Sequence, residues 1–251
     1  MDLQNKTVLI TGASGGLGQI AGRMMMENGW QVAQVTRDAS RMDSTQEDIG
    51  DIIEADVSTS EGSKTAVDLI KQRLGESPSA LFNCAGSVLI APMHRTHADQ
   101  YRECLQANLD SAFFSLSAFV SALIKKKQSG AAVLVSTVAA RIGVANHEAI
   151  AAAKGAIEAL VRSASATYSN KGIRVNAIAP GLMKSPATTR FFLNDKVEQQ
   201  IASQYPLGRY GDLKDAASAA AWLLSDEAGW ITGQVLAVDG GYSSVRPMLR
   251  R

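Results

Sequence analysis

Cysteine and aromatic residues are scarce in this sequence, and each shortage excludes a class of protein. Two cysteines, Cys84 and Cys104, in a chain of 251 residues argue against a disulfide-stapled fold and against a structural zinc site. Aromatic residues make up only 6% of the chain, which is too few for a surface that stacks nucleic-acid bases. The composition therefore excludes both a disulfide scaffold and a base-stacking platform.

The sequence also lacks an excess of charge and a long apolar run. It has 25 basic and 24 acidic residues and a formal net charge of +1, so no overall attraction to nucleic acid or to an anionic membrane is expected. No uninterrupted apolar run reaches the roughly 18 residues of a membrane span, and residues 1–6 lack the basic and apolar parts of a signal peptide. We expect a soluble, cytoplasmic protein with neither nucleic-acid nor membrane partners.

What the chain does contain is a regular alternation of short apolar runs and longer amphipathic stretches. Hydrophobic residues at 46% and charged residues at 20% are typical of a globular protein. Continuous apolar strands alternating with helices indicate a parallel sheet covered on both faces, and no linker divides them. The sequence predicts an α/β fold with one domain over residues 1–251. The seven expected strands are 7–10, 31–35, 51–55, 80–82, 132–135, 173–178 and 235–238.

The first expected strand runs into a glycine-rich segment and then into a helix. Glycine lets the backbone turn sharply and approach a ligand closely, and a helix start offers free N–H groups to a phosphate. The spacing is Gly-x-x-x-Gly-x-Gly at Gly12, Gly16 and Gly18, not the Gly-x-Gly-x-x-Gly of the strict dinucleotide fingerprint. We interpret it as a phosphate-binding turn; the alternative is an ordinary glycine-rich connection between a strand and a helix.

The residues after the second expected strand bear on the choice of dinucleotide. A carboxylate there would bind the ribose hydroxyls of NAD, but this sequence has Thr36 and Arg37, followed by Asp38. A guanidinium pairs well with a phosphate, so Arg37 favours the 2′-phosphate of NADP(H) over NAD(H). The alternative is a solvated surface arginine with Asp38 as its neighbour.

Several further motifs follow in a fixed order along nearly the whole chain. They are Asp56-Val57, Asn83-Cys84-Ala85-Gly86, Asn108, the loop at 180–185 and the run at 231–241. Together with the turn at 11–18, they make the sequence resemble the short-chain dehydrogenase/reductase family. The resemblance implies a Rossmann-type, doubly wound sheet of seven parallel strands with NAD(P)(H) at its carboxyl edge. It also implies hydride transfer between the nicotinamide and an alcohol or carbonyl compound.

The family motifs imply a set of cofactor contacts, with two departures from the usual pattern. Cys84 stands at the second position of the family's Asn-Asn-Ala-Gly motif, and Ser185 replaces a threonine while keeping a hydroxyl. No metal site is expected. The expected cofactor-binding residues are Gly12, Ser14, Gly16, Leu17, Gly18, Thr36, Arg37, Asp56, Val57, Asn83, Ala85, Gly86, Lys154, Pro180, Gly181, Met183 and Ser185.

The catalytic motif of the family is only partly present. Lys154 matches its lysine and Asn108 matches its asparagine, but Ile150 stands four residues before the lysine, where the family has its proton-donating tyrosine. Thr137 stands thirteen residues before Ile150, in place of the family's serine, and keeps a hydroxyl donor. Carbonyl reduction needs a proton or a strong hydrogen bond at the oxygen, which Ile150 cannot give.

His147 is a candidate substitute for the missing tyrosine. It lies three residues before Ile150, on the same face of an expected helix, and imidazole is a capable general acid near neutral pH. The alternative is a surface or interface histidine without a chemical role. The expected catalytic set is therefore Asn108, Thr137, Lys154 and, as a hypothesis, His147.

Three functions remain open at this stage. The first is an NADP(H)-dependent oxidoreductase with a rearranged acid/base site, acting on a small molecule under a substrate loop at about residues 185–210. The second is a catalytically silent NADP(H)-binding protein that serves as a sensor or partner subunit, and the third is a non-redox reaction such as dehydration. The resemblance also implies a homodimer or homotetramer built on the helix at 147–168 and the helix after Asn108, unless these are internal core helices.

Overall fold

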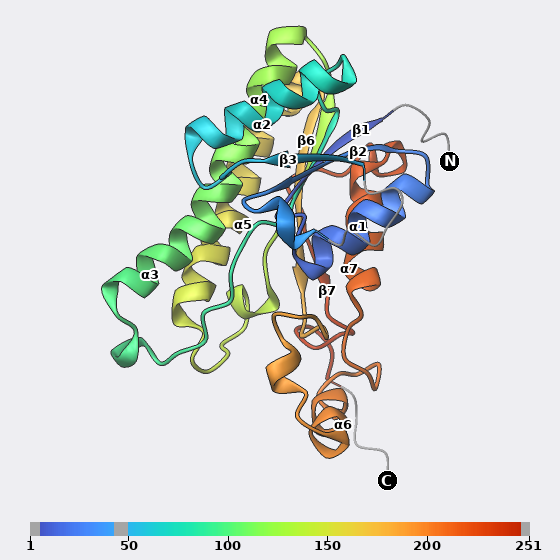
Figure 1. Ribbon diagram of the computed structural model, residues 1–251. Coiled ribbons are helices and arrows are strands. Elements are labelled where there is room, and N and C mark those ends of the chain that lie inside the picture. Colours follow the sequence, from blue (N-terminus) through green and yellow to red (C-terminus); the bar gives the residue numbers. More distant parts are fainter. Residues whose placement is uncertain (1–5, 43–49, 247–251) are drawn as a thin grey trace.

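A computed structural model describes residues 6–42 and 50–246 of the chain (Figure 1). Residues 1–5, most of the segment predicted to carry no signal peptide, lie outside the described residues. Seven parallel strands form one sheet in the order β3-β2-β1-β4-β5-β6-β7. This confirms the predicted Rossmann-type, doubly wound sheet of a single domain. The strands are β1 Thr7–Thr11, β2 Gln31–Thr36, β3 Asp51–Glu54, β4 Ala80–Asn83, β5 Gly130–Val135, β6 Ile173–Pro180 and β7 Val235–Val238.

Helices cover both faces of this sheet. In Figure 1, α2, α4 and α5 lie on one side of the sheet, α1 and α7 lie on the other, and α6 lies beyond the carboxyl edge. The short helix α3 packs against α5. The helices are α1 Gly16–Glu27, α2 Ser60–Leu74, α3 Ala98–Leu105, α4 Ser111–Lys126, α5 Glu148–Tyr168, α6 Asp195–Ser203 and α7 Leu213–Leu224.

The sheet separates two apolar cores because successive side chains of a strand point to opposite faces. In β1, Leu9 belongs to the core that contains Phe119 of α4, whereas Ile10 belongs to the core that contains Met25 of α1. All four side chains are at most 1% exposed. Strands buried on both faces give the continuous apolar runs from which the sheet was predicted.

Two strands extend two residues beyond a predicted limit, and β1, β2 and β4 each extend one residue further than predicted. β5 begins at Gly130, which pairs with Ile173, and β6 continues to Pro180, which pairs with Val238. A Cβ atom on Gly130 would lie 2.6 Å from the Cδ1 atom of Leu123, so tight packing against α4 requires glycine there. Glycine and proline both have low strand propensity, which explains why the sequence pattern did not include these ends.

The order of the strands places a crevice at the carboxyl edge. β1 lies between β2 and β4, so the chain winds outward in one direction to β3 and then returns to begin β4 on the other side of β1. Ligands of doubly wound sheets bind at such a switch point, where the connections diverge. The ends of β1 and β4 are joined there by a hydrogen bond of 2.7 Å from the Asn83 amide to the Thr11 hydroxyl.

One helical run among the described residues, residues 98–126, is long and apolar enough to cross a membrane. It comprises α3, a π-helical turn at Gln106–Asp110 and α4. Half of its apolar window is buried inside the fold, where α4 packs against α2 and the sheet. Core helices meet the same criteria of length and hydropathy, so this run is weak evidence for a membrane span.

The burial of α4 predicts a stability difference between two phenylalanines of the same helix. Phe119 is fully buried, and Phe119→Ala should lower the free energy of unfolding by about 3–5 kcal/mol because it leaves a cavity. Phe113 is 51% exposed, so Phe113→Ala should lower it by about 1 kcal/mol or less. Urea denaturation of both variants measures the difference, and equal losses would contradict this orientation of α4.

Candidate active site

The turn after β1 is shaped by close backbone contacts that only glycine allows. Gly12 has φ +66°, and a Cβ atom there would lie 2.6 Å from both the N and Cα atoms of Ala85. A Cβ atom on Gly18 would lie 2.6 Å from the carbonyl oxygen of Gly12. These contacts bring the turn against the β4 loop on one side and against the first turn of α1 on the other.

The N-terminus of α1 carries no side-chain cap. Gly15 occupies the N-cap position and makes no side-chain hydrogen bond to the first turn. By contrast, side chains of Thr59, Asn194 and Asp212 accept hydrogen bonds from the first turns of α2, α6 and α7. The first N–H groups of a helix lack intrahelical partners and attract anions. Together with the glycine turn, the end of α1 therefore fits a phosphate group.

The end of β2 lies directly beside this turn. The Thr36 and Ser14 hydroxyl oxygens are 3.0 Å apart, so the predicted ribose-binding position and the glycine turn are in contact. The Asp38 carboxylate forms hydrogen bonds within its own turn. It accepts them from the Ser40 amide at 3.0 Å and from the Ser40 hydroxyl at 2.6 Å. The Ser40 hydroxyl is the main reason that the pKa of Asp38 is lowered.

Arg37 is exposed at the same place. Within residues 6–42 and 50–246, its guanidinium forms no ion pair, with Asp38 or any other acid. It is therefore available to an anionic ligand that approaches the end of β2.

Asp56, Val57 and Asn83 differ in how far they face the crevice. Asp56 is exposed and accepts hydrogen bonds from the Ser58 amide at 3.0 Å and hydroxyl at 2.8 Å. Val57 is buried in the core under α2 and α4. Asn83 is 1% exposed, and its amide points to Thr11 inside the sheet. Side-chain contact with a ligand is thus open to Asp56, while Val57 and Asn83 support the edge from within.

The loop after β6 reaches the same edge. Met183 is buried and forms an isolated parallel bridge with Gly211. The Ser185 hydroxyl lies 2.9 Å from the Thr188 hydroxyl, and the Ser185 amide donates to that hydroxyl at 2.9 Å. This hydrogen-bonded turn gives the predicted carboxamide-binding loop a defined shape.

Asn108 and Lys154 converge on Gly86. A Cβ atom on Gly86 would lie 2.6 Å from the Asn108 Oδ1 atom and 3.4 Å from the Lys154 Nζ atom. Lys154 Nζ also donates a hydrogen bond of 2.8 Å to the carbonyl oxygen of Val135, the last residue of β5. Thr137 follows two residues later and begins the next short helical turn. The structure therefore brings Asn108 and Lys154 together at Gly86, and Thr137 follows two residues after the Val135 carbonyl that Lys154 binds.

The π-helical turn holds the Asn108 side chain in place. Asn108 is fully buried, and its amide nitrogen donates to the Cys104 carbonyl at 2.9 Å and to the Ser87 carbonyl at 3.2 Å. Turns of this kind often occur at functional positions of helices. The turn fixes the amide between α3 and the β4 loop.

Lys154 is a buried ammonium without a carboxylate partner. It is 7% exposed, and this burial lowers its pKa from the ordinary 10.5 to about 8 because desolvation disfavours the charged form. Burial also raises the pKa values of the nearby Cys84 and Cys104 thiols, which keeps both neutral near pH 7. The next acid along α5, Glu158, accepts from the Ser136 hydroxyl at 2.9 Å and pairs with Arg141.

Ile150 and His147 lie near the start of α5, in different surroundings. Ile150 is 5% exposed and packs with Ala149, Cys104 and Leu89 in a small apolar cluster. His147 caps the helix by position, and its Nδ1 atom lies 2.7 Å from the Ala145 carbonyl oxygen. An Nδ1–H donor at this contact leaves Nε2 as the group that could face a ligand. No described hydrogen bond connects His147 to Asn108, Thr137 or Lys154.

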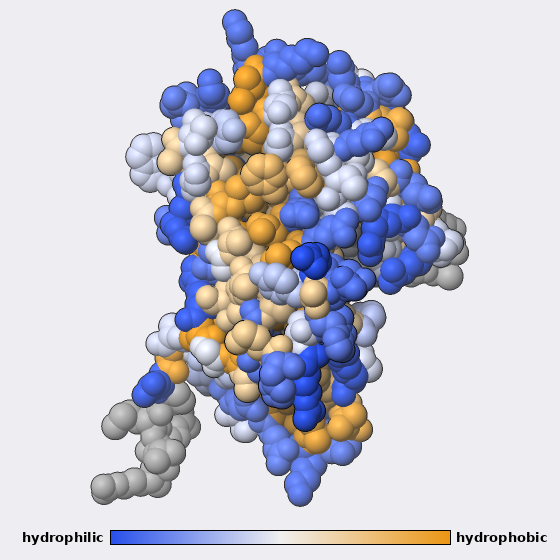
Figure 2. All heavy atoms as spheres, turned by 90° about the vertical axis from the view of Figure 1, so that its left-hand side faces the viewer, coloured by the Kyte–Doolittle hydropathy of each residue, from blue (hydrophilic) through white to orange (hydrophobic). Residues whose placement is uncertain are grey.

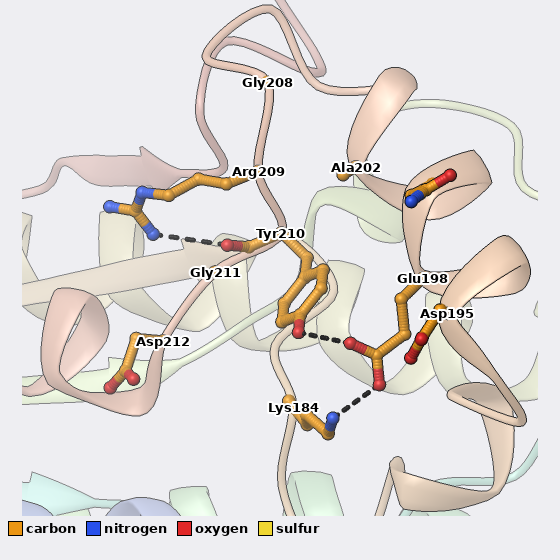
Figure 3. Close-up of a pocket in the computed structure, with 10 residues that line it drawn as sticks. Lys184, Asp195, Glu198, Ala202, Gly208, Arg209, Tyr210, Gly211 and Asp212 are labelled. Carbon is orange, nitrogen blue, oxygen red and sulfur yellow. Dashed lines mark hydrogen bonds and ion pairs between the residues drawn. The ribbon is translucent and has the colours of Figure 1, made fainter.

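A cavity of about 670 Å³ lies within the predicted substrate loop (Figure 3). In it, Glu198 of α6 accepts hydrogen bonds from the Lys184 ammonium and, at 2.7 Å, from the Tyr210 hydroxyl. The hydrogen bond from Lys184 is the main reason that the pKa of Glu198 is lowered. Sequence reasoning missed this group because no motif links positions so far apart. Asn108, Thr137 and Lys154 do not line this cavity.

In the part of the chain that the structure describes, no group of three or more His, Cys, Asp or Glu side chains could hold a metal ion. The polar groups at the carboxyl edge include the hydroxyls of Ser14 and Thr36, the Asn108 amide, the Lys154 ammonium, the Arg37 guanidinium and the carboxylates of Asp38 and Asp56. This set suits an anionic, hydroxyl-rich ligand such as a dinucleotide.

Known proteins resemble this chain over its whole length. A family model described as enoyl-(acyl carrier protein) reductase matches residues 12–243. The 2,5-dichloro-2,5-cyclohexadiene-1,4-diol dehydrogenase of Sphingobium indicum is 30% identical over 248 residues, which are 97% of this chain and 99% of the relative. The inactive 2-(S)-hydroxypropyl-CoM dehydrogenase 2 of Xanthobacter autotrophicus is 31% identical over 230 residues, which are 89% of this chain and 99% of the relative.

A solved structure is similar to the same extent. The ligand-free aldohexose dehydrogenase of Thermoplasma acidophilum matches with a TM-score of 0.90 and 27% sequence identity. The match covers 100% of this chain and 98% of that chain. The similarity therefore includes the carboxyl edge as well as the sheet.

The buried Lys154 predicts that stability rises with pH. Between the folded pKa of about 8 and the ordinary value of 10.5, the unfolded chain holds a proton that the folded protein has lost, so the free energy of unfolding increases. Relative to Lys154→Met, the wild type should gain about 2 kcal/mol between pH 7 and pH 9.5, measured by urea denaturation. The exposed Lys126→Met serves as control, and a constant difference between wild type and Lys154→Met would contradict the shift.

Proposed function

Because the chain belongs to the short-chain dehydrogenase/reductase family, we propose that it is an NADP(H)-dependent oxidoreductase that interconverts an alcohol and a carbonyl compound. One observation carries this proposal. The β4 loop touches Gly12 through Ala85, and it touches Asn108 and Lys154 through Gly86. The glycine-rich turn at Gly12 and the polar site of Asn108 and Lys154 thus lie on either side of the β4 loop.

The residues of the carboxyl edge fit a dinucleotide. The uncapped start of α1 would receive the diphosphate, Arg37 the 2′-phosphate, and Lys154 the ribose next to the nicotinamide. When bound, the nicotinamide supplies or accepts the hydride. The proposed cofactor contacts are Gly12, Ser14, Gly16, Leu17, Gly18, Thr36, Arg37, Asp56, Val57, Asn83, Ala85, Gly86, Lys154, Pro180, Gly181, Met183 and Ser185.

The site stabilises a substrate oxygen without a tyrosine. Thr137 donates its hydroxyl to the oxygen on which negative charge develops, and the Lys154 ammonium adds positive charge nearby. Asn108 holds the β4 loop through Ser87. Ile150 contributes an apolar wall and no proton. This arrangement is the rearranged acid/base site that we propose.

His147 is a second candidate for the proton donor. Its Nδ1 contact with Ala145 leaves Nε2 as the ring nitrogen that could face a substrate. The alternative role is that of a surface histidine at the start of α5. The activity of His147→Ala distinguishes the proton-donor role from that of a surface histidine.

The similar proteins suggest a class of substrate. The names of the Sphingobium and Thermoplasma enzymes both refer to rings that bear hydroxyl groups, a cyclohexadienediol and an aldohexose. We therefore propose a cyclic secondary alcohol or its ketone as substrate. The loop at 185–210, with the buried Phe192 and Tyr205, would cover it.

A second copy of the chain would cover the face of α3, α4 and α5. Figure 2 shows apolar side chains gathered on this side of the molecule. On α3 and α4, Tyr101, Phe113 and Ile124 are 42%, 51% and 39% exposed. Contiguous exposed apolar surface is typical of an interface. We propose a homodimer or homotetramer built on this face.

Arg37 decides cofactor preference if it binds the 2′-phosphate. Arg37→Ala should raise the Kd for NADPH by about 10-fold or more, since one charge-assisted contact contributes on the order of 1.5–3 kcal/mol. The Kd for NADH should stay within about twofold, since NADH lacks that phosphate. Fluorescence titration measures both constants, with Arg23→Ala as the exposed control. Equal loss for both dinucleotides would refute this role.

Turnover of cyclic alcohols and ketones tests the reaction itself. The wild type should oxidise cyclohexanol with NADP⁺, and Thr137→Ala should lower kcat by about 10²-fold while Thr137→Ser retains most of it. His147→Ala should lower kcat only if the imidazole carries the proton. Tight NADPH binding without any turnover by the wild type, together with turnover by Ile150→Tyr, would instead identify a silent cofactor-binding protein.

A further inference from the structure

The position of the family's proton donor is closed by apolar packing. Ile150 lies one helical turn before Lys154, on the same face of α5. Its side chain packs with Ala149, Cys104 and Leu89 and is 5% exposed. Isoleucine carries no proton donor, so the proposed reaction takes its proton from another group close to α5.

Lys154 has hydrogen-bonding capacity to spare. An ammonium has three N–H donors, and in residues 6–42 and 50–246 the Nζ atom has one hydrogen-bond acceptor, the carbonyl oxygen of Val135 at 2.8 Å. The absent Cβ of Gly86 leaves a position 3.4 Å from Nζ and 2.6 Å from Asn108 Oδ1. Gly86 is exposed and Lys154 is 7% exposed, so the ammonium lies just beneath the surface of the β4 loop.

The groups that surround Lys154 leave it able to release a proton. Cys84 from the β4 loop and Cys104 from α3 are the titratable neighbours that act on its charge, and burial raises the pKa of both. Glu158 is held by Arg141 and Ser136. Burial of the ammonium lowers the pKa of Lys154 to about 8. General acids work best when their pKa is close to the operating pH.

We propose that the Lys154 ammonium is the proton donor of this site and does the work of the missing tyrosine. The inference rests on the proposed oxidoreductase function and names its acid. In reduction, hydride from NADPH forms the new C–H bond, the carbonyl π pair moves to oxygen, and oxygen takes a proton from Nζ, directly or through one water. The products are the alcohol, NADP⁺ and a neutral amine, which water reprotonates. Oxidation runs these steps in reverse.

The variant Lys154→Arg separates proton transfer from charge. Arginine keeps a positive charge and hydrogen-bond donors but does not release a proton at working pH. We expect kcat for cyclohexanone reduction to fall by about 100-fold or more, with the Kd for NADPH within about threefold of the wild type. The exposed Lys126→Arg should match the wild type in both. Comparable kcat for Lys154→Arg and wild type would overturn the proposal.

A tyrosine should rescue this variant. Ile150→Tyr/Lys154→Arg places a phenol one turn from the guanidinium, which provides a new proton donor. We expect its kcat to exceed that of Lys154→Arg by about 10-fold or more, whereas a variant that had simply lost its fold would gain nothing. Absence of rescue with intact NADPH binding would count against proton transfer as the defect in Lys154→Arg.

Direct titration tests the proposal without turnover. With ¹³C-labelled lysine and NADP⁺ bound, one Cε resonance should titrate near pH 8 and be missing from Lys154→Arg. Lys154 titrating only above pH 10 would overturn the donor role, even in a protein that binds NADPH and reduces ketones. Failure of the wild type to bind NADPH would instead refute the proposed function.

Discussion

The contact between Gly12 and Ala85 sets the distance between the two halves of the carboxyl edge. No side chain fits between these backbones, because a Cβ atom on Gly12 would come within 2.6 Å of Ala85. The end of β1 therefore lies directly against the β4 loop, and Asn83 joins the same strands by its hydrogen bond to Thr11. The next residue of that loop, Gly86, meets Asn108 and Lys154. A displacement of Gly12 would therefore shift the β4 loop and, through Gly86, the surroundings of Asn108 and Lys154.

The second constraint is the attachment of α5 to the end of β5. Two side chains one turn apart on the helix hold the last residue of the strand and the residue after it, since Lys154 binds the Val135 carbonyl and Glu158 accepts a hydrogen bond from the Ser136 hydroxyl. Arg141 balances the charge of Glu158, whereas Lys154 has no ion pair within the described residues 6–42 and 50–246. Helix α5 is therefore anchored by the ion pair of Glu158 with Arg141, whereas the Lys154 ammonium is desolvated. That imbalance is destabilising for the fold and useful for proton chemistry.

Sequence patterns predicted the sheet well because its five inner strands are largely buried on both faces and read as apolar runs, while the edge strands β3 and β7 are partly exposed. They also predicted Asn108 and Lys154, which meet at Gly86 in the structure; the catalytic roles of Asn108, Thr137 and Lys154 stay predictions. Contacts between distant segments had no such pattern. The packing of Ile150 against Cys104 depends on how α3 meets α5, and the link from Lys184 through Glu198 to Tyr210 depends on how α6 folds back. The pKa of Lys154 follows from burial, which no local motif encodes.

The strand order has a consequence for how the protein forms. β1 pairs with β4 as well as with β2, so Thr11 must meet Asn83 across 72 residues of intervening chain. Loop closure over such distances is slow compared with local pairing. The carboxyl edge at β1 and β4 forms only once these two strands have paired. An unfolded or partly folded chain therefore offers a dinucleotide no comparable surface. A ligand bound there would consequently hold the whole sheet together by mass action, with a melting temperature that depends on ligand concentration.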